Sequence, residues 1–273
     1  MMGLEGLVTN LRAIVARAYV RVVGANRELS WLFFDTFLPL LGTAAYVFIY
    51  RAMHAPPEFT GYVILGGAMT AYWLNVLWNM ASQFYWEKEQ GQLELFLIAP
   101  ASPMAILLGM AIGGMFMTTI RAASVLILGS LIFHVQFSVQ QPLLLALIFF
   151  LAMAALYGMG MLFASLFMLW GREAWHLSNL LQEPVYLLSG FYFPVRGLGF
   201  WVAAVASVIP LTLGLDGMRQ LAFGGAEWGF LPPTLELGLL AVLSIGFIYL
   251  ARRALRFMEE LGKRKGRLTL RWQ

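Results

Sequence analysis

The chain has 273 residues, and its composition points away from an ordinary soluble protein. Hydrophobic residues make up 60% of the chain and charged residues only 12%, whereas a soluble domain is about half apolar and a quarter charged. Several apolar stretches approach the ~20 residues that cross a bilayer core. The composition therefore predicts a polytopic membrane protein. The net charge of +4 fits basic residues on the cytoplasmic side of a membrane better than nucleic-acid binding.

Metal and thiol chemistry are not expected. Cysteine is absent, so no disulfide or thiolate metal site can form. The three histidines, His54, His134 and His176, lie far apart in the sequence. We therefore predict no metal site and no catalytic residue in this chain.

The hydrophobic pattern predicts an all-α fold, with six spans in one domain over residues 1–273. In chain order the spans are expected at 31–50, 61–84, 103–133, 142–169, 173–188 and 233–252. Residues 1–28 show no cleavable signal, and their apolar positions recur at helical spacing, which predicts a helix lying in the cytoplasmic interface. A loosely attached leader is the alternative. The glycine- and proline-rich segment 189–231 predicts two short helices that enter the membrane from the extracytoplasmic side and return.

The basic residues predict the orientation. With six spans and the N-terminus inside, fourteen lysines and arginines lie on the cytoplasmic side, eight of them from Arg252 to the end of the chain. Only Arg51, Arg196 and Arg219 lie outside, and Arg121 lies within a span. This asymmetry places both termini, including the basic tail 257–273, on the cytoplasmic side of the membrane. The expected membrane is the inner membrane of a bacterium.

A polar segment, QFYWEKEQGQLELFLIAPASP, separates the second and third spans at residues 83–103. Glu87, Lys88, Glu89 and Glu94 place four charges within eight positions. The spacing of its apolar and polar residues predicts a short amphipathic helix that ends at Pro100. Ser102 and Pro103 suit the N-cap and first turn of the third span. The alternative role is a solvated helix that only separates two spans.

Within this segment, EKEQGQLELFLIAPASP resembles the cytoplasmic loop of permeases of the type-2 ABC exporter family, with Gln92 in place of the usual threonine. Two later stretches, LLSGFYFPV from Leu187 and IPLTLGLDGMRQLAFGG from Ile209, resemble two further elements of that family. The resemblance covers the full length of the chain. It implies that segment 85–102 is a coupling helix seated in a cleft of an ATPase subunit.

The resemblance assigns the coupling role to a set of acidic, small and apolar residues. They are Glu87, Glu89, Gln90, Gly91, Leu93, Glu94 and Phe96. Acidic side chains can steer onto a basic cleft, and the apolar ones can anchor in it. The chain has no G-x-x-x-x-G-K-[ST] phosphate loop. ATP and magnesium are therefore expected on a partner ATPase, with no cofactor in this chain.

Two polar stripes run along the second and fifth spans. The first comprises Tyr72, Asn75, Asn79 and Gln83, and the second Asn179, Glu183, Tyr186 and Ser189, with His176 in line. Because polar groups facing lipid are costly, both stripes should face protein or a water-filled route. In the family these spans line the dimer interface and the substrate path. The alternative is hydrogen bonding that only holds the helices together.

Four charged residues within the membrane region have alternative partners. Glu183 precedes Pro184, whose ring favours a kink. Glu183 is either a substrate or gate contact, or it is buried as a partner of Arg121 or of neighbouring amides. Arg121 can also pair with Asp216. Asp216 and Arg219, spaced i and i+3, can pair with each other on a short helix.

An aromatic cluster is expected at the outer membrane boundary. Phe191, Tyr192 and Phe193 form either an interfacial belt or an outer gate for a lipid-like or sugar-linked substrate.

The leading functional prediction is the transmembrane subunit of an ATP-driven exporter of an amphipathic or hydrophobic cargo, such as a drug, a lipid or a lipid-linked glycan. Its expected partners are ABC ATPase subunits, a second permease copy in a homodimer or heterodimer, and membrane lipids. One alternative is a membrane scaffold or sensor without transport. Another is an intramembrane enzyme, which the presence of only two aspartates, Asp35 and Asp216, and the lack of an H-E-x-x-H motif disfavour.

Overall fold

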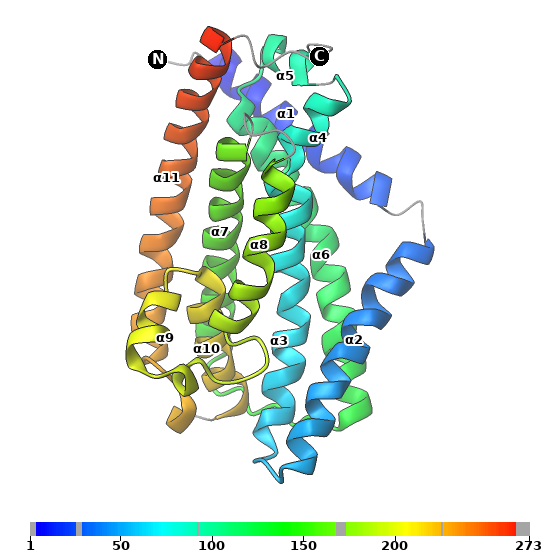
Figure 1. The fold of residues 1–273 in the computed structure, drawn as a ribbon, viewed down its shortest axis with the longest axis vertical. Coiled ribbons are helices and arrows are strands. Elements are labelled where there is room, and N and C mark those ends of the chain that lie inside the picture. Colours follow the sequence, from blue (N-terminus) through cyan, green and yellow to red (C-terminus); the bar gives the residue numbers. More distant parts are fainter. Residues whose placement is uncertain (1–3, 26–28, 92, 168–172, 225, 266–273) are drawn as a thin grey trace.

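The computed structural model describes residues 4–25, 29–91, 93–167, 173–224 and 226–265, and this part of the chain contains helices and no strand. The long helices run along one axis, with α1 laid across the bundle near one end (Figure 1). In chain order the elements are α1 (Leu4–Ala25), α2 (Leu29–Ala52), α3 (Glu58–Leu74), the π-helix η1 (Asn75–Ala81), α4 (Gln83–Glu89), α5 (Leu93–Ile98), α6 (Pro103–Phe133), α7 (Pro142–Phe167), α8 (Glu173–Leu188), the 3₁₀-helix η2 (Val195–Leu198), α9 (Phe200–Ala206), α10 (Pro210–Phe223), the 3₁₀-helix η3 (Ala226–Trp228) and α11 (Pro233–Lys265).

Each predicted span overlaps a helix, but not every helix is long and apolar enough to cross a membrane. Among the described residues, three helices pass that test: Pro103–Phe133, Pro142–Phe167 and Pro233–Leu261. A fourth is added if α9 and α10, which meet at a bend of 113°, count as one broken span. The apolar part of α2, Thr36–Ala52, is shorter. The all-helical membrane fold is therefore confirmed, whereas the count of six spans stays a prediction.

The core lies where α7 packs along α11, α10 and η1, while α3 packs against α6, α2 and α10. Its largest buried side chains include Trp73, Tyr72 and Phe84. α4, α5, α1 and the C-terminal half of α11 gather at one end of the bundle (Figure 1). The hairpin between α2 and α3 lies at the opposite end, toward which α9 and α10 are also displaced. The polar segment and the aromatic cluster are thus separated along the bundle axis.

The start of α6 follows the predicted capping. Ser102 adopts an extended conformation and its hydroxyl accepts a hydrogen bond from the backbone N–H of Ala105 at 3.1 Å. Pro103 occupies the first turn, where a missing N–H costs nothing. The backbone N–H of Ser102 also donates to the side-chain oxygen of Asn10 at 2.8 Å, so the cap is tied to α1.

Two glycines on α6 allow α1 to pack closely against it. A Cβ at Gly109 would lie 2.6 Å from the carbonyl oxygen of Ile14, and one at Gly113 would lie 2.8 Å from that of Ala18. The spacing Gly-x-x-x-Gly puts both on one helix face, where their lack of a side chain lets two backbones approach. The leader alternative is therefore wrong within residues 4–25, because α1 is docked along α6.

Replacing Gly113 by alanine should test this packing. The new methyl group would collide with backbone atoms of α1, so we expect Gly113→Ala to lower the free energy of unfolding by about 1–3 kcal/mol. Gly246→Ala is the matched control, because a Cβ there meets nothing within 4 Å. An alanine in an open helical position should be neutral or stabilising by up to about 1 kcal/mol. Thermal unfolding of the purified chain in detergent measures both; equal effects would contradict the close contact.

Candidate functional site

The charged segment forms two short helices, α4 and α5, where the spacing predicted one. The break follows Gln90 at Gly91, whose backbone is left-handed with φ of +71°. A glycine adopts this conformation without strain, which ends α4 and redirects the chain. The prediction of one continuous helix is therefore wrong, and Gly91 supplies the turn.

A buried ion pair fastens these helices to α1. The Nη2 of Arg17 donates to the Oε1 of Glu87, which is only 3% exposed. The Nε2 of Gln83 donates to the same carboxylate oxygen at 2.6 Å. The guanidinium of Arg17 also lies 4.9 Å from the ring centre of Phe96 on α5, a cation–π contact. Arg17 therefore contacts α4 through an ion pair and α5 through a cation–π interaction.

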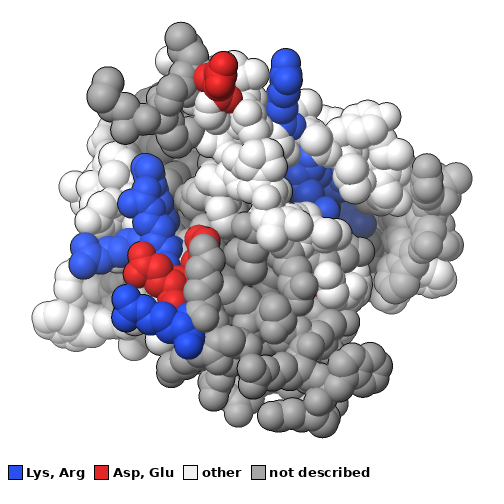
Figure 2. Space-filling view, turned by 90° about the horizontal axis from the view of Figure 1, so that it is seen from above, with Lys and Arg blue, Asp and Glu red and all other residues white. Residues whose placement is uncertain are grey.

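Figure 2 looks onto this end of the bundle, where basic and acidic side chains lie side by side. Of the predicted coupling residues, Gln90 and Gly91 are exposed, Phe96 is half-buried and Glu87 is inside. The side chains of Glu89, Leu93 and Glu94 lie outside the described part of the chain. Contact of this surface with a partner stays a prediction.

The polar stripe of the second span continues from α3 into η1 and α4, and much of it bonds within the chain. Tyr72 donates its hydroxyl to Thr119 at 2.8 Å, and the Oδ1 of Asn75 accepts from the Tyr157 hydroxyl at 3.1 Å. The Oε1 of Gln83 accepts from Arg21 at 3.0 Å. These bonds join neighbouring helices, as expected if the stripe only holds the helices together.

The polar stripe of the fifth span lies on α8 and is more open. His176, Asn179 and Glu183 are exposed, whereas Ser189 is buried. Glu183 accepts from its neighbour Gln182 at 3.2 Å. The helices that carry the two stripes are joined by a hydrogen bond from the indole N–H of Trp78 in η1 to the Oε1 of Gln182 in α8, at 2.8 Å. Tyr186, half-buried, packs edge-on against Phe191 with ring centres 5.3 Å apart.

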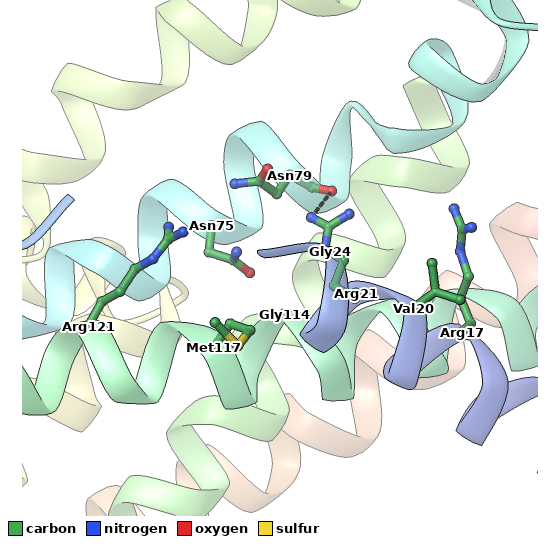
Figure 3. A pocket seen from close by; sticks show the side chains of 9 residues that line it. All are labelled: Arg17, Val20, Arg21, Gly24, Asn75, Asn79, Gly114, Met117 and Arg121. Carbon is green, nitrogen blue, oxygen red and sulfur yellow. Dashed lines mark hydrogen bonds between the residues drawn. The ribbon is translucent and has the colours of Figure 1, made fainter. Parts of the chain in front are cut away.

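A cavity of about 350 Å³ lies between α1, η1 and α6 (Figure 3). Asn75 and Asn79 of the predicted substrate path line it. The other lining residues are Arg17, Val20, Arg21, Gly24, Gly114, Met117 and Arg121. Sequence reasoning missed Arg17 and Arg21 as site residues. Their i, i+4 spacing on the polar side of α1 was the available signal, together with the Gly109–Gly113 motif opposite.

Toward the end of the bundle opposite α4 and α5, Arg219 of α10 holds the loop that follows α8. This fully buried guanidinium donates to the backbone carbonyls of Gly190, Phe191, Phe193 and Tyr62, at 2.7, 2.7, 3.0 and 3.0 Å. Backbone carbonyls within a membrane need partners, and Arg219 supplies them for a non-helical turn. The loop is thereby fixed against α3.

The predicted gate aromatics lie in this loop. Phe191 is fully buried, and Gly66 leaves space for its carbonyl, because a Cβ at Gly66 would overlap that oxygen. Tyr192 stacks on Tyr46 of α2 with ring centres 4.0 Å apart. Phe193 lines a pocket of about 570 Å³ with Trp228. The three aromatics thus face different neighbours.

Asp216 and Arg121 lie in separate environments, whereas Asp216 remains close enough to the buried Arg219 for their charges to interact. Asp216 accepts from the Nε2 of Gln220 and the backbone N–H of Phe230, both at 2.8 Å. Its role is to anchor the segment after α10. Arg121 lies elsewhere, in the cavity beside α1.

The four-carbonyl contact of Arg219 should make this residue sensitive to a conservative change. Lysine presents a compact ammonium without the planar fork, so it cannot reach all four carbonyls. We expect Arg219→Lys to lower the free energy of unfolding by at least about 2 kcal/mol. Arg196→Lys, at an exposed arginine that donates to one carbonyl, should change it by less than about 0.5 kcal/mol. Chemical unfolding in detergent compares the two; an equal response would contradict the clamp.

The ion pair of Arg17 and Glu87 can be measured by a double-mutant cycle. We expect Arg17→Gln and Glu87→Gln to be coupled by about 1–3 kcal/mol, because both groups share one hydrogen-bonded contact. Pairing Arg17→Gln with Glu227→Gln, at the other end of the bundle, should give additive effects within about 0.5 kcal/mol. Thermal unfolding of the unmodified chain, the three single variants and the two double variants supplies the numbers. Additivity of the first pair would exclude a stabilising contact.

The fold and site together define a multi-pass, all-helical membrane protein with a charged helix pair bound to its first helix. Residues 9–223 match the ABC-2 type transporter family, and the chain belongs to this family. It is therefore a transmembrane subunit of an ABC transporter, which confirms the resemblance seen in the sequence.

Curated relatives agree with this assignment. The "probable multidrug ABC transporter permease YbhR" of Escherichia coli strain K12 is 28% identical to this chain over 156 residues. That alignment covers 55% of this chain and 41% of the relative. The protein of the same name from Escherichia coli O157:H7 gives the same values. The match therefore spans well under half the length of these relatives.

Proposed function

We propose that this chain is the membrane subunit of an ATP-driven exporter of an amphipathic or hydrophobic cargo, a drug, a lipid or a lipid-linked glycan. In this proposal the chain crosses a bacterial inner membrane six times, with both termini in the cytoplasm. The pair α9 and α10 forms a re-entrant element on the outer side. ABC ATPase subunits bind at the end that carries α4 and α5.

One observation carries the proposal: a continuous set of polar contacts leads from the charged segment to the middle of the bundle. Glu87 of α4 bonds Arg17 of α1 and Gln83, and Gln83 bonds Arg21. Arg21 in turn donates to the carbonyl oxygen of Asn79 in η1 at 3.1 Å. A displacement of α4 and α5 by an ATPase would therefore move α1 and η1 as well. This is the geometry that a coupling segment needs.

The ATPase partner follows from the family and from what the sequence lacks. Without a phosphate loop the chain has no usual means of holding ATP, so ATP and magnesium bind to a separate ATPase. Glu89 and Glu94 are the acidic contacts, and Leu93 is an apolar anchor beside them. Glu87 contributes from inside, because its carboxylate fixes Arg17 rather than facing outward.

A second copy of the chain, or a homologous partner, would cover the polar face of α8. Asn179 and Glu183 are exposed on a helix otherwise flanked by exposed apolar residues such as Leu180 and Leu187. A carboxylate facing lipid is costly, so this face favours contact with protein or an aqueous path. We place the substrate path along this face, between the two protomers.

The outer aromatics suit a lipid-like cargo. Phe191, Tyr192 and Phe193 lie on a loop that Arg219 holds at a fixed position. Phe191 is buried and supports the loop from inside, whereas Phe193 lines a pocket of about 570 Å³. Its ring can stack on apolar or sugar-bearing molecules as they leave. The multidrug name of the relatives is consistent with an amphipathic cargo.

Charge reversal at Glu94 tests the coupling role. We expect Glu94→Lys to weaken binding of the partner ATPase at least about tenfold, because a repulsive contact replaces a favourable one. ATP-dependent movement of a fluorescent lipid or drug in proteoliposomes should fall in parallel. Glu260→Lys, the same change at an exposed position on α11, should leave both unchanged. If Glu94→Lys retains both ATPase binding and coupled transport, the segment is not the coupling element. ATPase binding without cargo movement in the unmodified complex would favour the scaffold alternative.

A further inference from the structure

The cavity between α1, η1 and α6 is lined by basic side chains that the packing of these helices does not require. Three of its nine lining residues are arginines, Arg17, Arg21 and Arg121, and none is acidic. Asn75 and Asn79 add amide groups from η1. Figure 3 shows that these lining side chains come from three elements, α1, η1 and α6, with Arg17 and Arg121 at opposite ends of the cavity. Arginine is the side chain best suited to bind phosphate and carboxylate oxygens.

A glycine and several fixed polar side chains keep the cavity open. A Cβ at Gly114 would lie 2.8 Å from the Oδ1 of Asn75, so a glycine is needed for η1 to approach α6. Asn75 and Asn79 both belong to the π-helix, an element that is rare and concentrated at functional sites. Arg21 is oriented by Gln83 and by the carbonyl of Asn79. Its guanidinium is therefore held in place before any ligand arrives.

Electrostatics favour an anion at this position. Burial, followed by the charge of Arg17, lowers the pKa of Arg21, and Arg121 acts in the same direction. Glu87 offsets part of this repulsion through its bond to Arg17, but it does not line the cavity. Glu87 is bonded to Arg17, so an anion in the cavity would chiefly offset the remaining repulsion that Arg21 and Arg121 experience.

The surroundings of the cavity are apolar, which points to an amphiphile. Val20 and Met117 line the cavity itself. Next to them along their helices, Tyr19 of α1 and Phe116 of α6 are exposed by 67% and 55%. At the membrane surface, where an amphipathic helix such as α1 lies, these side chains meet acyl chains. The cavity volume of about 350 Å³ is enough for a small polar head group.

We propose that this cavity binds a phosphate group, and that an anionic membrane amphiphile carries it with its tails along the exposed apolar faces of α1 and α6. Arg17, Arg21 and Arg121 neutralise the phosphate charge, and Asn75 and Asn79 donate hydrogen bonds. The site is a property of this chain alone and does not depend on the proposed export activity.

Native mass spectrometry of the purified chain in detergent tests the proposal with phosphatidylglycerol and phosphatidylcholine as probes. We expect tighter binding of phosphatidylglycerol, and a loss of at least about tenfold in its affinity for Arg121→Gln, the value of one charge-assisted hydrogen bond. Arg21→Lys, which keeps the charge but loses the fork, should show a smaller loss. Arg253→Gln removes the same charge from an exposed position on α11 and should bind as the unmodified chain does.

The outcomes separate this site from general attraction between a basic surface and anionic lipid. Equal losses in Arg121→Gln and Arg253→Gln would overturn the site. A competition arm with inorganic phosphate identifies the source of the ligand: binding of phosphate alone, without any lipid preference, would overturn the amphiphile. Unfolding temperatures of the variants are recorded without lipid. If Arg121→Gln is unfolded, phosphatidylglycerol binding is measured instead for Arg21→Lys and for Asn75→Leu, which removes the amide from the lining. Weaker binding by both variants supports the site, and unchanged binding by both overturns it.

Discussion

The ion pair of Arg17 and Glu87 joins parts of the chain that would otherwise be independent. It buries a carboxylate of the charged segment against the first helix, with Gln83 and the ring of Phe96 completing the contact. A buried charge is tolerated only where partners replace the water it loses. The positions of α4, α5 and α1 are therefore linked, and α1 is in turn seated on α6 by two glycines. The proposed coupling and the arginine cavity both follow from this linked arrangement.

The membrane region satisfies its polar groups in two different ways. On the second span, Tyr72, Asn75 and Gln83 bond neighbouring helices, so this stripe stabilises the protomer. On α8, the exposed Asn179 and Glu183 are presented at the surface of the protomer. The two stripes look alike in sequence because helical spacing reports a shared face and not what covers it. Only the tertiary packing separates an internal role from an external one.

The helical pattern could be predicted closely where apolar runs are long and capped. The limits of α6 follow from Ser102, Pro103 and an uninterrupted apolar run, and the sequence predicted the same range as the structure. The break at Gly91 and the π-helix at 75–81 could not be predicted, because each depends on contacts with distant segments. The four carbonyl partners of Arg219 likewise come from two places in the chain, the loop 190–193 and Tyr62, and its spacing from Asp216 suggested a different partner. Membership of the ABC-2 type transporter family was predictable because it rests on local motifs.

The docking of α1 has a consequence for the order in which the protein assembles. Arg17 and Glu87 are separated by 70 positions, and the helix that receives α1 begins only at Pro103. During synthesis α1 emerges before α6, so the face that carries Ile14 and Ala18 does not yet have the helix on which it later packs. Until α6 is inserted, the membrane surface is the available place for this face. α1 is therefore made before the helix that receives it, and it reaches its final position only after the segment from α2 to α5 has been synthesised. Conditions that slow insertion would lengthen the time that this early segment spends on lipid alone.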